Sequence, residues 1–416
     1  MNPPAPHALI DATLARLRSR RDCGAQSASV RFSLATPWDA AQPQADLAAV
    51  FESRGGRLRG FVTDRTAATH AAAEFEAAAD AAGAAIIDWQ APLALDTAIV
   101  EKPWGRECWY TGVEARGVSR VSDGRHATPL PWVLALDPAG FQGPAPLVLA
   151  KRLEPHPEPV RGDLYFEMHE TKREVYVVTA VDRSVWPDGT GAIRFGMNAA
   201  LRRRYGDDAR FRADYLAAVR RYEDVRRAID AGRCDAAALA DERRLRAGMD
   251  AFTTLCELRV GDVVQVPTFF PHALQHGVRV IELQTPVYER RILSFAQSTP
   301  TQDRWDTGDV IDNLCLDAHP LASIDTLEDD GSVRVERIAR FPDFEAYRIR
   351  LAPGARHRLE RADTHRLCVA IDGTLAVSGR ILDAEDACLL SVALGPIDLH
   401  DASGSGATCI VAVPQR

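Results

Sequence analysis

Polar and apolar side chains alternate along residues 163–180, which predicts extended β structure there. One face of the extended chain carries three polar side chains: Tyr165, Glu167 and His169. The positions between them are apolar, and the alternation resumes at Glu174 after a short polar break. The pattern predicts a half-buried hairpin whose tip is residues 170–173 and whose polar face lines the lumen of a β-barrel.

Shorter periodic segments occupy the first 95 residues. Apolar positions at helical spacing predict helical stretches at residues 7–20, 46–54 and 67–82. Strand-like runs separate these stretches at residues 29–34, 58–62 and 84–88. Together they predict a small α/β unit over residues 1–95. The unit contains no glycine-rich phosphate-binding pattern, so no chemistry is assigned to it.

A block of helical periodicity interrupts the β-rich region at residues 198–255. Its apolar residues recur three or four positions apart, from Phe211 to Ile229. Gly232 is a candidate helix stop, and Asp235 is a candidate N-cap for a following helix. The block predicts a helical insertion between the two halves of a barrel.

Strand-like runs return after the insertion, at residues 263–266 and 278–283. Beyond residue 316 three further runs are separated by turn residues, and they cover residues 344–351, 367–371 and 374–377. The sequence therefore predicts a mainly β protein with a helical insertion. Its expected parts are the α/β unit at residues 1–95, a first barrel at 96–316 and a second barrel at 317–416.

Composition restricts the possible partners. A chain of 416 residues is long enough for two or three domains at roughly 150 residues each. Its net charge of −8 disfavours nucleic acid, no apolar run approaches the ~20 residues of a membrane span, and no signal peptide is recognised. The eight cysteines are widely spaced, so neither a disulfide framework nor a thiolate zinc site is expected. We expect a cytoplasmic protein without membrane or nucleic-acid partners.

Histidine and carboxylate side chains recur on the predicted barrel strands. His169 and Glu174 lie five residues apart near the first hairpin, and His272 follows about a hundred residues later. Two hairpins that direct imidazoles into one lumen can hold a single divalent metal. His276 is expected to be structural rather than a further ligand.

Lysine is rare in this chain. Of the 50 basic residues only three are lysine, Lys102, Lys151 and Lys172, and the rest are arginine. Lysine is a compact cation whose pKa responds to burial. All three lie in or beside the segments that carry the candidate metal ligands, which supports a role for them in the same site.

Several segments together resemble the cupin superfamily, and more narrowly its type I phosphomannose isomerases. The segments from Gly162 to Glu174 and from Gly261 through Pro267 to His272 match the two cupin motifs in residue type and spacing. Further matches are Glu101-Lys-Pro-Trp-Gly105, Leu147-Val-Leu-Ala-Lys151, Lys172-Arg-Glu174 and the stretch from Pro271 to Gln284. The resemblance covers about residues 97–416. It implies two cupin barrels, of which the second is degenerate and is expected to hold no metal.

Carried over residue by residue, the resemblance implies one divalent metal held by Glu167, His169, Glu174 and His272. Zinc is expected, with manganese or iron as alternatives. The implied catalytic residues are Glu282 as base, Arg291 as the cation beside the oxyanion, and Lys172. The implied substrate-binding residues are Lys102, Lys151, Tyr165 and Arg290, and Arg290 would replace Arg291 if the register slips by one.

Three positions depart from the family pattern. Glu167 stands where the family has glutamine, so two carboxylates and two neutral imidazoles would leave bound Zn²⁺ formally neutral. This weakens its Lewis acidity and favours Mn²⁺ or Fe²⁺. Tyr165 replaces a serine and Gln297 replaces a basic residue, both of which contact phosphate in the family. The substrate class therefore stays open between a sugar phosphate, an unphosphorylated sugar and a bulkier sugar derivative.

The resemblance implies a metal-dependent aldose–ketose isomerase, similar to mannose-6-phosphate isomerase, that acts through an enediol. Two alternatives remain at the level of sequence. One is an iron-dependent cupin oxygenase, since cupin barrels with histidine and carboxylate ligands also hold Fe²⁺. The other is a non-catalytic cupin protein that binds a sugar. The sequence does not predict an oligomeric state.

Overall fold

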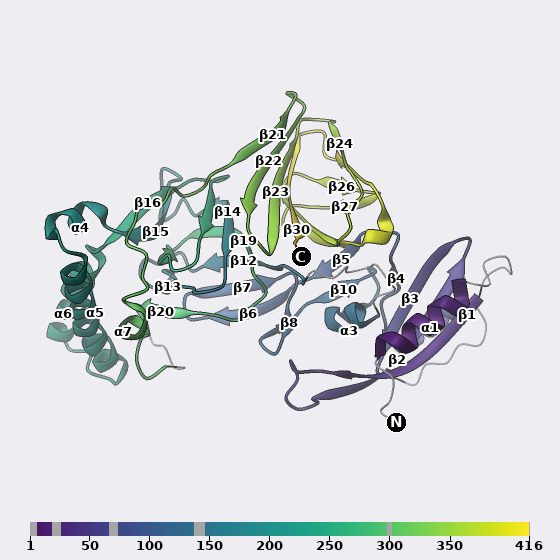
Figure 1. Ribbon diagram of the computed structural model, residues 1–416, viewed down its shortest axis with the longest axis horizontal. Helices are drawn as coiled ribbons and strands as arrows, with labels where there is room; N and C mark the ends of the chain where they lie inside the picture. Colours follow the sequence, from purple (N-terminus) through teal and green to yellow (C-terminus); the bar gives the residue numbers. More distant parts are fainter. Residues whose placement is uncertain (1–5, 19–25, 66–73, 137–145, 298–301, 416) are drawn as a thin grey trace. The chain divides into compact units, whose positions relative to one another are not determined.

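The protein is mainly β, and most of its strands form antiparallel sheets (Figure 1). The computed structural model describes residues 6–18, 26–65, 74–136, 146–297 and 302–415. By its internal contacts the chain divides into two compact units. The first comprises Met1–Val100, Cys108–Lys151 and Ile324–Arg416, and the second comprises Glu101–Glu107 and Arg152–Ser323. The division into three parts at residues 95 and 316 stays a prediction.

The N-terminal segment of the first unit forms a four-stranded antiparallel sheet. Its strands follow the order β1 (Gln26–Ala35), β2 (Gln44–Arg54), β3 (Arg57–Thr63) and β4 (Ile87–Asp88). Helix α1 (Pro6–Arg18) packs against β1. Helix α2 (Phe75–Ala82) buries Phe75 and Ala79 against Val50 and Phe61 of the sheet.

One helix expected in this segment is a strand. Residues 46–54, predicted to be helical, belong to β2, which pairs with β1 on one side and with β3 on the other. The run from Leu47 to Phe51 is buried throughout, so the strand lacks the alternation that marks a half-exposed strand. Gly55 and Gly56 both have positive φ and close the hairpin to β3. Of the helix expected at 67–82, α2 covers 75–82, and residues 66–73 lie outside the described residues.

The C-terminal part of the first unit is built from two sheets. The larger has nine strands in the order β11 (Ala127–Pro129), β10 (Arg120–Ser122), β5 (Leu93–Asp96), β28 (Ala387–Leu390), β25 (Arg366–Asp372), β30 (Ala407–Pro414), β23 (Phe344–Leu351), β22 (Val333–Arg340) and β21 (Asp325–Asp329). The smaller has the order β24 (Arg356–Leu359), β29 (Ile397–Asp401), β26 (Leu375–Val377) and β27 (Arg380–Leu382). Side chains of both sheets share one apolar core.

The three strand-like runs expected after residue 316 are confirmed as β23, β25 and β26. The turns between strands were also anticipated, since Gly354 and Gly373 both adopt positive φ. The pairing of β5 with β28 was not anticipated, because it joins residues nearly three hundred positions apart. This region also contains helix α3 (Leu130–Ala135), the small hairpin of β8 (Val113–Glu114) and β9 (Gly117–Val118), and a 3-10 helix, η2 (Val392–Leu394).

Two further sheets carry the second unit. The six-stranded sheet has the order β17 (Val263–Val266), β14 (Glu174–Val181), β19 (Val278–Gln284), β12 (Leu149–Pro155), β7 (Gly105–Trp109) and β6 (Ala98–Lys102). The five-stranded sheet has the order β16 (Thr253–Leu258), β15 (Gly191–Met197), β18 (His272–Leu274), β13 (Phe166–Met168) and β20 (Arg291–Ser294).

Residues 163–180 form two strands, as predicted, but these strands are not a hairpin. β13 pairs with β18 and β20, whereas β14 pairs with β17 and β19 of the other sheet. Residues 169–173 therefore link the two sheets instead of turning within one. The polar side chains that the alternation placed on one face of a hairpin therefore come from two different sheets.

The predicted helical insertion is confirmed. It consists of α4 (Ala199–Tyr205), α5 (Asp208–Asp230) and α6 (Ala236–Asp250), and α5 and α6 lie side by side (Figure 1). Asp235 caps α6 by accepting a hydrogen bond from the Ala238 amide at 2.8 Å, as expected. Aromatic residues of α5 share a core with strand residues such as Ile193 and Phe195, so the helices are anchored by burial on the sheet. A short helix, α7 (Thr307–Val310), follows β20. Among the described helices, none has the length and apolar character needed to cross a membrane.

Candidate metal centre

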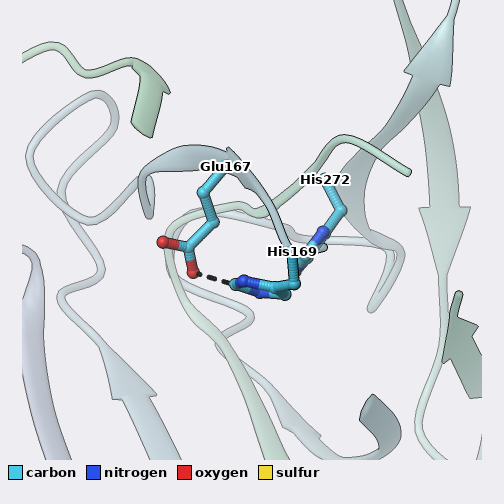
Figure 2. A group of neighbouring side chains, drawn as sticks. All are labelled: Glu167, His169 and His272. Atoms are coloured by element: carbon cyan, nitrogen blue, oxygen red, sulfur yellow. Dashed lines mark ion pairs between the residues drawn. The ribbon is translucent and has the colours of Figure 1, made fainter. Parts of the chain in front are cut away.

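Three potential ligands from two adjacent strands gather at one point (Figure 2). Glu167 and His272 are direct cross-strand partners on β13 and β18, and His169 follows the last residue of β13. One donor atom from each lies within 4.8 Å of the other two. His169 Nε2 is 3.9 Å from Glu167 Oε1, and the two imidazole rings lie 5.3 Å apart between centroids. The sequence predicted this convergence.

Glu174 brings a second carboxylate to the cluster from the other sheet. It is the first residue of β14, and its two oxygens approach different histidines. Glu174 Oε1 is 3.4 Å from His169 Nε2, and Glu174 Oε2 is 3.1 Å from His272 Nε2. Two donors bound to one tetrahedral zinc lie about 3.3 Å apart, since each bond is about 2.0–2.1 Å. The measured spacings of 3.1, 3.4 and 3.9 Å lie near this value, so Glu174 is a fourth candidate ligand beside the group of three.

The contacts of the histidine nitrogens are compatible with a bound cation. His272 Nδ1 lies 3.2 Å from the Phe270 carbonyl, an arrangement in which Nδ1–H donates. Its Nε2 then carries a lone pair facing the Glu174 carboxylate, so a proton or a metal cation must lie between them. Among the described residues, neither nitrogen of His169 nor Glu167 Oε2 has a hydrogen-bond partner. Buried nitrogen and oxygen atoms without a hydrogen-bond partner are suited to coordinate a divalent metal.

Burial and nearby charge set the protonation of the cluster. Burial, with the Lys172 charge in support, lowers the pKa of His169, so its imidazole is neutral and available as a ligand. Burial alone would raise the pKa of Glu174, but the Lys172 ammonium and the His169 imidazole hold it well below its usual range. Neutral imidazoles and ionised carboxylates are the forms that bind zinc, manganese or iron.

Two side chains complete the surroundings of Glu174. The Lys172 ammonium makes an ion pair with Glu174 Oε1, and the Tyr176 hydroxyl donates to Glu174 Oε2 at 2.6 Å. Burial and the adjacent carboxylates raise the pKa of Tyr176, which keeps it a neutral donor. Lys172 thus lies directly beside a candidate ligand, as expected. Tyr176 was not assigned a role, although its position two residues after Glu174 places it on the same strand face.

Glu282, the candidate base, lies on β19 directly opposite Tyr176 of β14. It is only 3% exposed, and its charge contributes to the raised pKa of Tyr176. Glu282 is therefore the cross-strand neighbour of Tyr176, whose hydroxyl donates to Glu174. His276, by contrast, pairs with Asp163 at 2.7 Å and stacks on Trp186, apart from the four ligands.

The two candidate arginines have different surroundings. The guanidinium of Arg290 lies 4.4 Å from the centroid of the Tyr165 ring, and its Nε is 3.9 Å from Glu167 Oε2. Arg291 instead pairs with Glu170 at 2.9 Å, and its side chain is 43% exposed. Burial would lower the pKa of Arg290, but Glu167 and then Tyr165 raise it overall. The arginine beside the candidate ligand Glu167 is therefore Arg290.

The remaining candidates lie in different environments. Tyr165 packs on Phe295 at 4.3 Å between centroids, so its ring lies against both Phe295 and Arg290. Lys102 pairs with Glu107 at 3.4 Å, and both are largely buried. Lys151 belongs to the other unit, where it is 8% exposed and lies over the Trp109 ring at 5.3 Å. Gln297 donates to the Arg161 carbonyl.

Comparisons with known proteins support the fold. No protein-family model and no curated protein sequence matches this chain. Solved structures do match it. Mannose 6-phosphate isomerase from Bacillus subtilis is 14% identical with a TM-score of 0.57, and the match covers 77% of this chain and 99% of that one. A lysine-to-alanine variant of phosphomannose isomerase from Salmonella typhimurium is 11% identical with a TM-score of 0.58, covering 78% and 100%.

A third structure, a mannose 6-phosphate isomerase bound with zinc and yttrium, is 11% identical with a TM-score of 0.55. The match covers 78% of this chain and 100% of that one. Similarity at such low identity concerns the arrangement of the backbone. This chain therefore shares the β-rich fold of these mannose 6-phosphate isomerases.

Proposed function

We propose that this protein is a metal-dependent aldose–ketose isomerase that acts on a sugar or a sugar phosphate. The observation that carries the proposal is the buried convergence of Glu167, His169, Glu174 and His272 in a fold shared with phosphomannose isomerases. These four residues would hold the ion. Zinc is the first candidate, and the two carboxylates keep manganese and iron as alternatives. A cytoplasmic location stays a prediction.

The chemistry requires a proton to move between two neighbouring carbons of the sugar. A bound divalent cation would orient the carbonyl and hydroxyl oxygens and stabilise negative charge that develops on them. Glu282 is the proposed base, because it is a buried carboxylate beside the Tyr176–Glu174 hydrogen bond. It would take the proton from one carbon and return it to the other through an enediol. Lys172 keeps Glu174 ionised and oriented.

Arg290 is the proposed cation beside the developing oxyanion. It is the arginine that approaches Glu167, whereas Arg291 is paired with Glu170. Its guanidinium lies over the Tyr165 ring, which restricts its rotation. Tyr165 and Lys102 would contact the substrate near the same ligands, and Lys151 stays a substrate-binding candidate from the sequence.

Three measurements test the proposal. Elemental analysis of the purified protein should find about one divalent metal per chain, and His272→Ala should lose it. In deuterium oxide, NMR should detect deuterium at C1 or C2 of the substrate sugar when hexoses, hexose phosphates and pentoses are screened. His276→Gln is a matched control, because His276 is a partly buried histidine outside the ligand cluster. It should keep the metal and the exchange.

The alternatives predict other outcomes. Oxygen consumption with iron but not with zinc would identify an oxygenase instead. Thermal stabilisation by a sugar without any exchange would identify a binding protein. Absence of exchange with every sugar in the screen would remove the isomerase proposal, whatever metal is bound.

A further inference from the structure

The linker that begins at one candidate ligand, His169, and leads to another, Glu174, is held by a distant segment. Residues 169–173 connect β13 to β14, which lie in different sheets, so this linker has no strand partner of its own. Residues 285–291 lie against it. Thr285 donates its amide to the Arg173 carbonyl at 3.0 Å and accepts from the Arg173 amide, through its hydroxyl, at 3.1 Å.

Glu289 is the centre of this contact. Its carboxylate accepts hydrogen bonds from three consecutive backbone amides, those of Glu170, Thr171 and Lys172, with the last two at 2.8 and 3.0 Å. The Thr171 hydroxyl donates to the same carboxylate. Successive amides that point at one anion form a concave anion-binding arrangement. Here a side chain of the protein itself occupies it, and that fixes the path of the linker.

The linker begins at His169 and leads directly to Glu174, and both are candidate metal ligands. Neither can be placed by ordinary strand pairing with the other, because the two strands are in different sheets. Their donors are nevertheless only 3.4 Å apart. Ordering a linker that joins two ligands costs conformational entropy, and contacts made before the metal binds remove that cost from the binding step.

We propose that Glu289 is a positioning residue for the metal centre: it binds no metal itself, but holds the 169–173 linker so that His169 and Glu174 converge. This inference rests on the metal centre of the proposed function and adds a residue that no ligand motif contains. Arg291 contributes to the same contact through Glu170, although that ion pair is partly exposed.

The test measures metal affinity, by competition of purified apoprotein with a chromogenic chelator for Zn²⁺ and Co²⁺. Glu289→Ala should weaken binding about 10- to 100-fold, the usual effect of removing an outer partner of the ligands. Glu289→Gln keeps one carbonyl oxygen that can accept from Thr171 and Lys172, so its affinity should lie between those of Glu289→Ala and the unaltered protein. The absorption spectrum of bound Co²⁺ should change in the alanine variant, because ligand geometry sets its shape.

The matched control is Asp182→Ala. Asp182 follows the opposite end of β14, and its carboxylate accepts a hydrogen bond from the Ser184 amide at 2.8 Å. The substitution therefore removes a carboxylate–amide contact that lies away from the linker. It should leave affinity unchanged. If Glu289→Ala does not fold, the question is decided by whether Glu289→Gln binds metal more weakly than the unaltered protein.

The outcomes separate this inference from the proposed function. Unchanged Zn²⁺ affinity and an unchanged Co²⁺ spectrum in both Glu289 variants would overturn the positioning role while leaving the metal centre intact. If the unaltered protein binds no divalent metal, both ideas are wrong. Equal weakening in Asp182→Ala would show general destabilisation and would also overturn the positioning role.

Discussion

Arg290 and Arg291 are adjacent in sequence, but their guanidinium groups have different partners. Arg290 lies over Tyr165 beside Glu167, and Arg291 pairs with Glu170. We expect Arg290→Ala to lower kcat/KM about 10²- to 10³-fold, the usual effect of losing one group that stabilises an oxyanion. Arg291→Ala removes a partly exposed ion pair worth ~0–1 kcal/mol, so it should change kcat/KM less than about fivefold. Steady-state kinetics on the substrate found by exchange would check this. A larger loss of kcat/KM in Arg291→Ala than in Arg290→Ala would instead assign the cation beside the oxyanion to Arg291.

Asp401 gives a residue-scale prediction in the first unit. The amides of Gly354 and Gly406 and the hydroxyl of Ser403 donate to its carboxylate, and these bonds, led by that from Gly354, lower its pKa from 3.8 to about 2. A carboxyl group whose pKa is lower in the folded state than in the unfolded state stabilises the folded protein at pH values above its unfolded-state pKa. This stabilisation is lost as the pH falls through the folded-state pKa. Asp401→Asn should therefore be less stable than the unaltered protein at pH 6, with the difference shrinking between about pH 4 and pH 2.

Urea unfolding of both proteins across that pH range measures the effect. Asp398→Asn is the control, since the Asp398 side chain is exposed and its carboxylate lies 3.8 Å from the Arg358 guanidinium. It should show no such convergence. A stability difference for Asp401→Asn that stays constant down to pH 2 would contradict the assignment.

At the scale of elements, Gly162 shows why a glycine precedes β13. A Cβ on Gly162 would lie 1.8 Å from the His156 carbonyl oxygen and 2.8 Å from His276 Cβ. Gly162→Ala should therefore destabilise the second unit by about 1–3 kcal/mol, as overpacking usually does. Gly248→Ala is the matched control within α6, where a Cβ meets nothing within 4 Å. It should stabilise by ~0.5–1 kcal/mol because alanine favours a helix. Urea midpoints test the opposite signs, and equal shifts would refute the close-approach argument.

The sequence predicted the elements that local patterns determine. The helical insertion, the Asp235 cap and the strands before and after His272, β17 and β19, follow from periodicity and turn residues within short windows. β2 was mistaken for a helix because its residues are buried on both faces and rich in alanine. The separation of β13 from β14 could not be predicted, since strand pairing is decided by partners about a hundred residues away.

The same distinction holds within the candidate site. Glu167, His169 and His272 come from the two sequence segments that carry the motifs, and their side chains converge as expected. The choice between Arg290 and Arg291 depends on the register where β20 begins, which sequence spacing alone leaves open by one residue. Glu289 carries no local signal, because its partners are backbone amides that any sequence would supply.

At the scale of the whole molecule, the candidate ligands all belong to one of the two units. A ligand that binds only the folded state stabilises it by RT ln(1 + [L]/Kd), about 4.1 kcal/mol when free metal is a thousandfold above Kd. Amides that exchange only through unfolding of that unit should then exchange roughly a thousandfold more slowly. Hydrogen exchange with and without metal should therefore slow in described residues 152–297, while residues 324–415 change little. Slowing confined to residues 324–415 would contradict the location of the site, and equal slowing throughout would show that the two units unfold together.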